Sequence, residues 1–262
     1  MADATDKIRL EYDGVIGVIT NDNPDKRNAF DDTMDARLWE ILAELRERPD
    51  VRAVIWRGEG KAFSSGRDVG AIGGGQVEMT HHELMRRGHR GAQQIFDLDA
   101  PIIVAIQGWA IGASFQRALL CDIRIAAEDA QLGLTEINLA IIPGGGGTQR
   151  LPRLVGRGKA LEMILTGMRV PAAEALRIGL VERVVPVAEL LPAAQALARQ
   201  IADKAPIALR YAKEAVVGGL GLPLADGIRL ENDLATLLRT TEDRVEGAKA
   251  FVEKRKPKWT GK

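Results

Sequence analysis

The feature that most constrains this fold is the alternation of short apolar runs with glycine-rich turns and helical segments through the first two thirds of the chain. Residues 102–106 follow Pro101 as an uncharged, mainly β-branched run, which is typical of a central strand. Residues 51–56 form another run that is apolar enough to be buried on both faces. Because strands and helices recur in this order, the sequence predicts an α/β stack of similar strand–strand–helix layers.

The first elements have clear local signals. Residues 8–12 and 15–20 flank Asp13-Gly14, a two-residue turn signal that indicates a β-hairpin. The helix that follows can be capped by Thr33 or Asp32 and cannot continue past Pro49. Its apolar residues recur at the spacing of one helical face: Met34, Leu38, Ile41, Leu42 and Leu45. Further along, the sequence predicts a polar helix over 79–97 and short strands over 121–126 and 131–134.

After Gly156 the pattern becomes mainly helical. Only residues 181–185 are typical of a strand, whereas helical periodicity covers 157–167, 171–178, 188–203, 207–217, 223–239 and 241–254. Seven side chains give the last helices more apolar surface than so small a unit can bury: Leu222, Leu224, Ile228, Leu230, Leu234, Leu237 and Leu238. These side chains either contact other subunits or cover the α/β core.

Charge and composition exclude several classes of protein. The 36 basic and 36 acidic side chains balance among 262 residues, whereas a nucleic-acid binder normally has a basic excess. The single cysteine, Cys121, cannot form an internal disulfide and suits a reducing compartment. No uncharged apolar run approaches the roughly 18 residues of a membrane span, and the acidic first residues do not resemble a signal peptide. We therefore expect a cytoplasmic protein with no membrane or nucleic-acid partner.

The residues of several common catalytic chemistries are missing or misplaced. Residues 112–116, with Ser114 at the centre, begin like a G-x-S-x-G motif but end in Gln116 instead of glycine. A serine hydrolase is therefore not expected. His81, His82 and His89 fall in one predicted helix without metal-ligand spacing, and we interpret them as part of a solvated face. The sequence has neither a G-x-G-x-x-G motif nor a Walker lysine. We therefore expect no metal and no nucleotide cofactor.

Two glycine-rich turns remain, each between a predicted strand and a helix, and they begin at Gly108 and Ile141. Such turns expose main-chain N–H groups, and two of these converging on one oxygen would form an oxyanion hole, although ordinary tight turns explain the same pattern. Glu136 lies between apolar stretches. Either these partly bury it and raise its pKa toward the range of proton transfer, or it is a surface glutamate at the end of a strand. Asp122, at a helix-to-strand junction, is expected to accept backbone N–H bonds.

Several segments, in this order and spacing, resemble the crotonase, or enoyl-CoA hydratase/isomerase, superfamily over nearly the whole chain. They are Asn23-Pro24 with Asn28-Ala29, and residues 61–69 (KAFSSGRDV), 107–112 (QGWAIG), 121–126 (CDIRIA), 133–136 (GLTE), 142–151 (IPGGGGTQRL) and 251–256 (FVEKRK). The resemblance implies a spiral of ββα units over residues 1–195. It also implies a helical C-terminal region, residues 196–262, that serves trimerisation and covers the CoA pocket, in a homotrimer or a dimer of trimers.

The same resemblance implies acyl-CoA substrates whose thioester oxygen is held by two main-chain N–H groups. In this sequence those donors belong to Arg67 and Ala113. Lys26 or Arg27 and, from the tail, Lys254 are expected to meet CoA phosphates. The other substrate-binding positions that the resemblance implies are Ala62, Ser65, Asp68, Val69, Trp109, Gly112, Thr135 and Gly144. Coenzyme A is part of the substrate, so no separate cofactor is expected.

One position departs from the family pattern. Family hydratases have two glutamates; the second matches Glu136, whereas Gln116 stands at the first position. A carboxamide can orient water but cannot accept a proton at neutral pH as a carboxylate can. Double-bond isomerisation needs one carboxylate, which moves a proton from C2 to C4 while the oxyanion hole stabilises the dienolate. The alternatives are hydration of 2-enoyl-CoA, with a water held by Glu136 and the Gly144 amide, another one-carboxylate reaction, or a non-catalytic CoA- or RNA-binding homologue.

Overall fold

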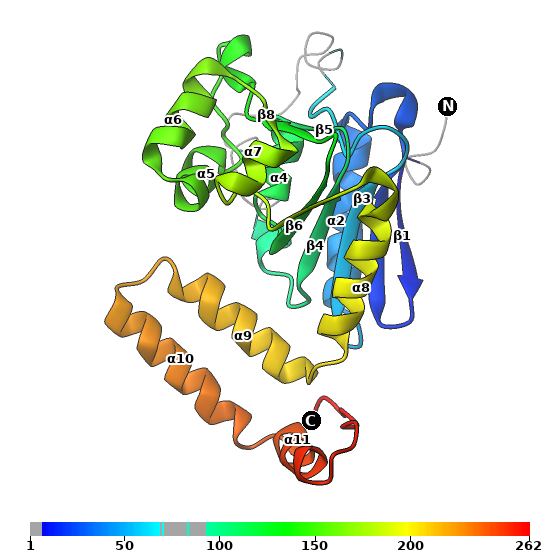
Figure 1. Ribbon diagram of the computed structural model, residues 1–262, viewed down its shortest axis with the longest axis vertical. Coiled ribbons are helices and arrows are strands. Elements are labelled where there is room, and N and C mark those ends of the chain that lie inside the picture. Colours follow the sequence, from blue (N-terminus) through cyan, green and yellow to red (C-terminus); the bar gives the residue numbers. More distant parts are fainter. Residues whose placement is uncertain (1–6, 69, 71–82, 84–92) are drawn as a thin grey trace.

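The computed structural model describes residues 7–68, 70, 83 and 93–262. Its larger sheet has six described strands in the order β1-β2-β3-β4-β6-β9 (Figure 1). They are β1 (Ile8–Asp13), β2 (Ile16–Asn21), β3 (Ala53–Gly58), β4 (Ile102–Ile106), β6 (Ile123–Ala127) and β9 (Arg183–Val185). β1 and β2 form the expected antiparallel hairpin, and the other neighbouring strands pair in parallel. The predicted α/β class is therefore confirmed.

Both faces of this sheet are buried because successive side chains point into two separate cores. Val54 and Trp56 of β3 pack in the core that contains α2 (Asp32–Arg46). Ala53 and Ile55 pack in the other core, against α8 (Leu190–Ala202). All five residues of β4 are buried, as the sequence predicts for a central strand. Figure 1 shows α2 and α8 on opposite faces of the sheet.

Helix α2 confirms the predicted apolar face, but its N-cap differs from the prediction. Asp31 is the cap, and its carboxylate accepts a hydrogen bond from the Met34 N–H at 2.9 Å. The prediction of Thr33 or Asp32 was wrong because Asp31, Asp32 and Thr33 can all cap a helix, and only the backbone decides among them. Asp31 has an extended backbone, whereas Asp32 is already helical.

A second sheet holds three short described strands in the order β5 (Trp109–Ile111), β7 (Gln131–Gly133) and β8 (Val170–Pro171). β7 was predicted, whereas β5 and β8 were not, because two or three residues are too few to show alternation. β5 leads into helix α4 (Ala113–Ala118), and β7 leads into the 3-10 turn η3 (Glu136–Leu139). Thus β4 and β6 are each followed by a short strand and then by helical residues, which is the predicted ββα order.

Most of the remaining described helices follow the predicted periodicity. These helices are α5 (Gly147–Val155), α6 (Arg157–Thr166), α7 (Ala172–Arg177), α9 (Pro206–Gly219), α10 (Leu224–Leu238) and α11 (Glu242–Val252), with 3-10 turns η1 (Pro24–Lys26) and η4 (Val187–Glu189). Helix α5 and the 3-10 turns were not among the predicted segments. The helix predicted over residues 79–97 lies mostly outside the described residues, as do its three histidines. No helix in the described part of the chain has the length and hydropathy to cross a bilayer.

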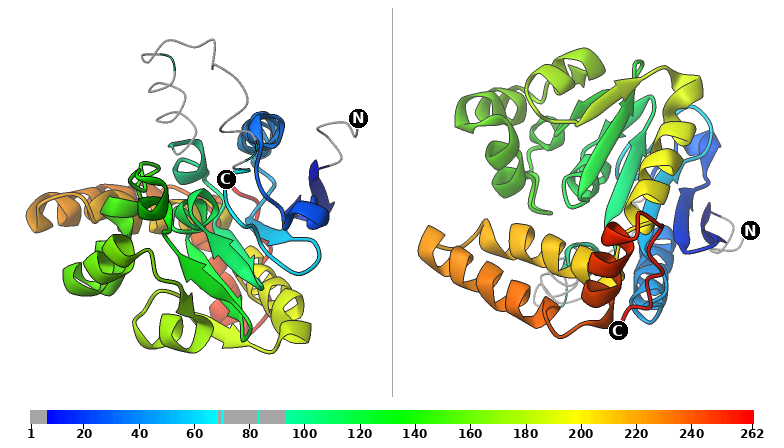
Figure 2. Two further views of the ribbon diagram at one scale, coloured as in Figure 1. Left: turned by 90° about the horizontal axis from the view of Figure 1, so that it is seen from above. Right: turned by 60° about the horizontal axis from the view of Figure 1, so that its bottom comes forward.

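The C-terminal helices stand apart from the two sheets. α9 and α10 lie side by side below the larger sheet in Figure 1, and Figure 2 shows α11 and the chain end beside them. Lys213 of α9 joins them to the core, since its ammonium donates to the Leu98 carbonyl at 2.7 Å and to the Asp122 carboxylate at 2.8 Å. Asp122 also accepts the predicted backbone bond, from the Ile102 N–H at 2.7 Å. The expected division between residues 195 and 196 falls inside α8.

Most of the seven apolar side chains named for this region do not cover the α/β core. Leu234 is buried, whereas Leu222, Leu224, Ile228 and Leu237 are 45–80% exposed. Helix α10 packs along α9, and Figure 1 shows it away from both sheets. This leaves a large apolar surface open on the single chain, of the kind that marks protein–protein contact.

Candidate active site

The turn between β5 and α4 brings a main-chain N–H to the start of a short helix. Gly112 has a φ of +55°, a backbone conformation that residues with a side chain rarely adopt. It is the N-cap of α4, and no side chain caps the helix there. The Ala113 N–H is therefore one of the donors that a helix leaves without an internal partner. A Cβ atom on Gly112 would lie 3.4 Å from Oε1 of Glu136. Glycine thus keeps this turn close to the carboxylate.

A second turn, around Gly66, lies directly against the first. Gly66 has a φ of +103°, and a Cβ atom there would lie 2.7 Å from the Ile111 carbonyl oxygen and 3.9 Å from the Ala113 nitrogen. Hydrogen bonds from Phe30 N–H to the Gly66 carbonyl and from Asp68 N–H to the Phe30 carbonyl flank Arg67. This pattern of a parallel bridge leaves the N–H of Arg67 pointing away from Phe30. The structure therefore places the Arg67 and Ala113 turns together.

Glu136 lies beside these turns because η3 begins shortly after β7, which pairs with β5. Its side chain is 8% exposed, and its Oε1 accepts a hydrogen bond from Nε2 of Gln116 at 2.5 Å. Its Oε2 is buried and has no hydrogen-bond partner among the described residues. Burial raises the pKa of Glu136, and the bond from Gln116 offsets part of that rise. Of the two readings of the sequence, the structure thus favours the desolvated carboxylate over the surface one.

Gln116 connects the carboxylate to the second glycine loop. Its Oε1 accepts hydrogen bonds from the N–H groups of Gly145, at 2.5 Å, and Gly147, at 3.3 Å. Two backbone donors on one atom identify that atom as the oxygen, so the amide nitrogen must face Glu136. A Cβ atom on Gly147 would lie 2.9 Å from side chains of Leu134 and Pro143. The loop can therefore approach Gln116 closely only with glycine at position 147.

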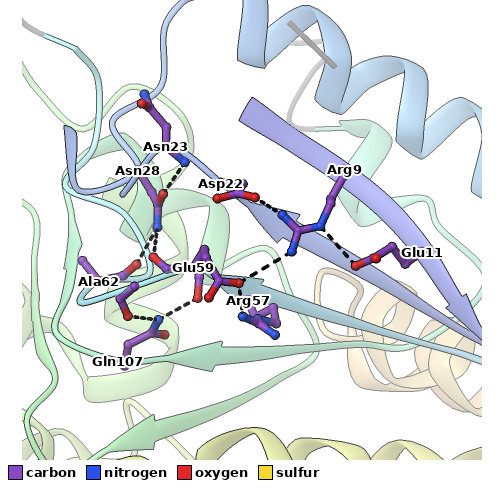
Figure 3. A network of polar contacts seen from close by, with 11 residues as sticks. Arg9, Glu11, Asp22, Asn23, Asn28, Arg57, Glu59, Ala62 and Gln107 are labelled. Atoms are coloured by element: carbon purple, nitrogen blue, oxygen red, sulfur yellow. Dashed lines mark hydrogen bonds and ion pairs between the residues drawn. The ribbon is translucent and has the colours of Figure 1, made fainter. Parts of the chain in front are cut away.

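A polar network holds the loops at the edge of this site (Figure 3). Asn28 donates from Nδ2 to the carbonyls of Ala62, at 2.7 Å, and Glu59, at 2.9 Å, and its Oδ1 accepts from the Asn23 N–H. Gln107 donates to the Gly58 carbonyl at 2.7 Å. These bonds fix the loop after β3 against the loop before α2. The predicted binding position Ala62 is buried in this junction.

Most of the other predicted binding residues lie around the two turns. Lys26 is exposed and forms an ion pair with Asp68 at 2.7 Å, and the Ser65 N–H donates to the Arg27 carbonyl at 2.9 Å. The guanidinium of Arg27 lies 4.6 Å from the centre of the Trp109 ring. These residues, together with Gly112 and Thr135, surround the two turns, and Gly144 lies exposed on the glycine loop. Val69 lies outside the described residues.

Lys254 is the predicted site residue that the single chain does not bring to this place. It is exposed and follows α11, which lies at the opposite end of the molecule from β5 and α4 (Figure 1). Among the described residues, no set of three histidine, cysteine, aspartate or glutamate side chains is arranged to hold a metal ion.

Two residues of α4, Ser114 and Arg117, make contacts around the site that were not predicted from the sequence. Ser114, which the sequence argues against as a nucleophile, is fully buried and shares a hydrogen bond with Ser64. Arg117, next to Gln116, forms a buried ion pair with Asp35 of α2. A charged residue inside so apolar a helix was the available signal for Arg117, but nothing in the local pattern identifies its partner.

Comparison with known proteins identifies the family of this chain. The enoyl-CoA hydratase/isomerase family matches residues 11–262. A Bacillus subtilis relative described as an enoyl-CoA hydratase/isomerase is 43% identical over 250 residues, or 94% of this chain and 95% of the relative. The (E)-benzylidenesuccinyl-CoA hydratase of Thauera aromatica is 39% identical over 259 residues, or 97% of this chain and 99% of that enzyme.

A solved structure shows the same fold. The crystal structure of an enoyl-CoA hydratase from Bacillus anthracis superimposes with a TM-score of 0.91 and 40% identity, over 98% of this chain and all of that one. The agreement extends through both sheets and the C-terminal helices, because nearly the whole of each chain is covered. The predicted crotonase-like fold is thereby confirmed, and this chain belongs to the enoyl-CoA hydratase/isomerase family.

Proposed function

We propose that this protein moves the double bond of an enoyl-CoA, with Glu136 as its single acid and base. The thioester oxygen binds between the main-chain N–H groups of Arg67 and Ala113. The observation that carries this proposal is the contact of the two turns beside a buried carboxylate whose second oxygen has no described partner. That oxygen, Oε2, is the atom that takes the proton. Coenzyme A arrives with the substrate, and no further cofactor takes part.

The reaction needs one proton to leave and return. Ionised Glu136 removes a proton from C2 of a 3-enoyl-CoA, and the electron pair spreads over the dienolate and the thioester oxygen. The two N–H donors stabilise the negative charge there, and losing one such donor typically costs about 3–4 kcal/mol of barrier lowering. Protonated Glu136 then returns the proton to C4, which leaves the double bond between C2 and C3. A raised pKa suits the first step, since it makes the carboxylate a stronger base.

The orientation of Gln116 supports isomerisation over hydration. Addition of water by two carboxylates requires a second side chain that can accept a proton, and the carboxamide of Gln116 cannot accept one at neutral pH. Its oxygen is already engaged by Gly145 and Gly147, and its nitrogen donates to Glu136. The carboxamide thus acts as a fixed hydrogen-bond donor that holds Oε1 and leaves Oε2 for the substrate.

Hydration of 2-enoyl-CoA is the second candidate. The names of the relatives favour it, since the Thauera aromatica relative is a hydratase. Gly144 lies exposed on the glycine loop, from which its N–H and Glu136 can share one water. A CoA-binding homologue without catalysis is the third candidate, and the neutral overall charge gives RNA binding no support.

Self-association completes the proposal. The exposed apolar side chains of α9 and α10 favour a homotrimer or a dimer of trimers. Lys254 lies far from the two turns of its own chain, so it reaches a bound CoA only from a neighbouring copy. Lys26, which is paired with Asp68, and Arg27 then meet the CoA phosphates from the same chain.

The test is to incubate the purified protein with 2-enoyl-CoA and 3-enoyl-CoA separately and to identify the products. We expect 3-enoyl-CoA to become 2-enoyl-CoA, with little 3-hydroxyacyl-CoA formed from either substrate. Rapid formation of 3-hydroxyacyl-CoA would establish hydration instead. If neither substrate reacts while CoA esters still bind, the non-catalytic homologue is favoured.

A further inference from the structure

The two segments that bear the Arg67 and Ala113 amides are joined by side chains as well as by the backbone. Asp35 of α2 lies between them. Its Oδ2 accepts a hydrogen bond from Nη1 of Arg67 at 2.6 Å, and its Oδ1 accepts one from Nη2 of Arg117. Arg67 bears one amide, and Arg117 belongs to the helix that begins at Ala113. One carboxylate therefore contacts both segments.

Burial makes this bridge well defined. The side chains of Asp35 and Arg117 are 13% and 12% exposed, so neither charge can turn to solvent without unpacking the site. Burial lowers the pKa of Arg117, while the charge of Asp35 acts in the opposite direction. The guanidinium of Arg117 also lies 4.1 Å from the centre of the Phe30 ring. Phe30 in turn holds Gly66 and Asp68 through its main chain.

A hydroxyl pair makes a second contact between the same segments. Ser64 and Ser114 are fully buried and share a hydrogen bond. Ser64 Oγ donates to the Asn28 carbonyl at 2.6 Å, so the Ser114 hydroxyl is the donor between the two serines. Ser64 Oγ also accepts from the Gly66 N–H at 3.2 Å. Ser114 directly follows Ala113, so this contact fixes one side of the turns while Asp35 fixes the other.

We propose that Asp35 is a positioning residue that sets the separation of the Arg67 and Ala113 amides through the side chains of Arg67 and Arg117. This inference rests on the proposed function, since it assumes that those amides bind the thioester oxygen. Asp35 itself touches no reacting atom. Its loss lets the two turns move apart, which weakens polarisation of the carbonyl more than it weakens CoA binding.

The experiment compares Asp35→Asn with Asp32→Asn. Asp32 lies on the same helix and pairs with Nη2 of the same Arg67 guanidinium, but no bond joins it to Arg117 among the described contacts. The probe is 4-(dimethylamino)cinnamoyl-CoA, whose absorption shifts to longer wavelength when its thioester carbonyl is polarised. We expect wild type and Asp32→Asn to show the full shift. We expect Asp35→Asn to lose at least half of it, with kcat about tenfold lower and KM changed less than about twofold.

A double variant separates positioning from folding. Asp35→Asn alone leaves the Arg117 charge buried without its carboxylate partner, which destabilises the protein. Asp35→Asn combined with Arg117→Met removes both charges, so it restores stability but not the bridge. We expect the double variant to unfold like wild type and still to lack the full shift. A full shift in a folded Asp35→Asn protein, or its recovery in the double variant, would overturn the proposal.

The same measurements distinguish this inference from the proposed reaction. If wild type shifts the probe but converts neither enoyl-CoA, the proposed reaction is wrong, and loss of the shift in Asp35→Asn still supports the role of Asp35. If wild type binds the probe without a shift, the amides do not hold the carbonyl, and the positioning role fails with them.

Discussion

Residues 7–202 and residues 203–262 bury very different shares of their apolar side chains. In the first region, most large apolar residues of the strands and of α2 and α8 are buried in two cores. In the second region, the buried apolar residues among those described are Leu234 and Ala250. Nine large ones are exposed there: Val216, Leu220, Leu222, Leu224, Ile228, Leu237, Val245, Phe251 and Val252.

This difference separates two tasks within one chain. The α/β region holds its turns rigidly because strands packed on both faces leave little freedom to the loops that join them. Glu136, Gln116 and both N–H donors lie in that region. The C-terminal helices attach to it through few contacts, such as Lys213, and keep an apolar surface open. The chemistry is thus expected to depend on the first region, and assembly on the second.

The largest expected effect is on turnover, from Glu136→Gln. The substitution keeps the shape and the bond from Gln116 but removes the proton acceptor, so we expect kcat to fall by about a thousandfold. Because burial raises the pKa of Glu136, the native state binds this proton more tightly than the unfolded state, and wild type loses stability as pH rises through that pKa.

The variant should therefore be at least as stable as wild type at pH 7 in urea unfolding, and the difference should close as pH falls toward the ordinary value of 4.5. Glu40→Gln, on the exposed face of α2, is the matched control and should change neither quantity. Retained turnover in Glu136→Gln would place the acid and base elsewhere.

The next effect tests the core of the first region. Leu38 of α2 is fully buried, and Leu38→Ala leaves a cavity between the helix and the sheet. We expect the free energy of unfolding to fall by about 2–5 kcal/mol, at every protein concentration. Urea unfolding at two concentrations measures this, with Leu10→Ala, at a partly buried position of β1, as a graded comparison. A small change at Leu38 would contradict a densely packed first region.

The second region is tested at Leu224, which is 80% exposed on the single chain. If a second copy covers this surface, Leu224→Asp places a charge in an apolar interface and weakens association by about 1–3 kcal/mol. We expect sedimentation equilibrium to show smaller species while circular dichroism stays unchanged. Asn232→Asp adds the same charge at a polar, exposed position of the same helix and serves as control. An unchanged mass would show that this surface makes no subunit contact.

The smallest expected effect comes from Gln116→Glu. The new carboxylate still accepts from Gly145 and Gly147, but its other oxygen meets Oε1 of Glu136, where the amide donated at 2.5 Å. Two carboxylates so close cannot both be ionised, so the pair shares a proton and provides the second acid and base.

We expect hydration of 2-enoyl-CoA to rise about tenfold, without a gain in isomerisation. The product ratio by chromatography measures it, and Gln149→Glu, exposed on α5, should leave the ratio unchanged. No gain in 3-hydroxyacyl-CoA would show that the missing carboxylate does not limit hydration.

Elements with strong local patterns were predictable from the sequence. The run that became β4, the hairpin around Asp13-Gly14 and the apolar face of α2 each carry their signal within a few residues. The cap of α2 and the short strands β5 and β8 do not, because adjacent residues offer equal choices or the segment is too short to show a period. The resemblance supplied the site residues, and the structure brings most of them together, except Lys254.

The sequence by itself determined the α/β class and the glycine turns, since these depend on residue type and local order, and the family resemblance matched Gln116 and Glu136 to the two glutamate positions. Only the tertiary structure decided that Gln116 turns its nitrogen to Glu136, that Asp35 lies between Arg67 and Arg117, and that the last helices leave their leucines uncovered. Such pairings join residues up to 82 positions apart. Local periodicity cannot predict them, because the packing of the strands and helices decides which distant side chains come into contact.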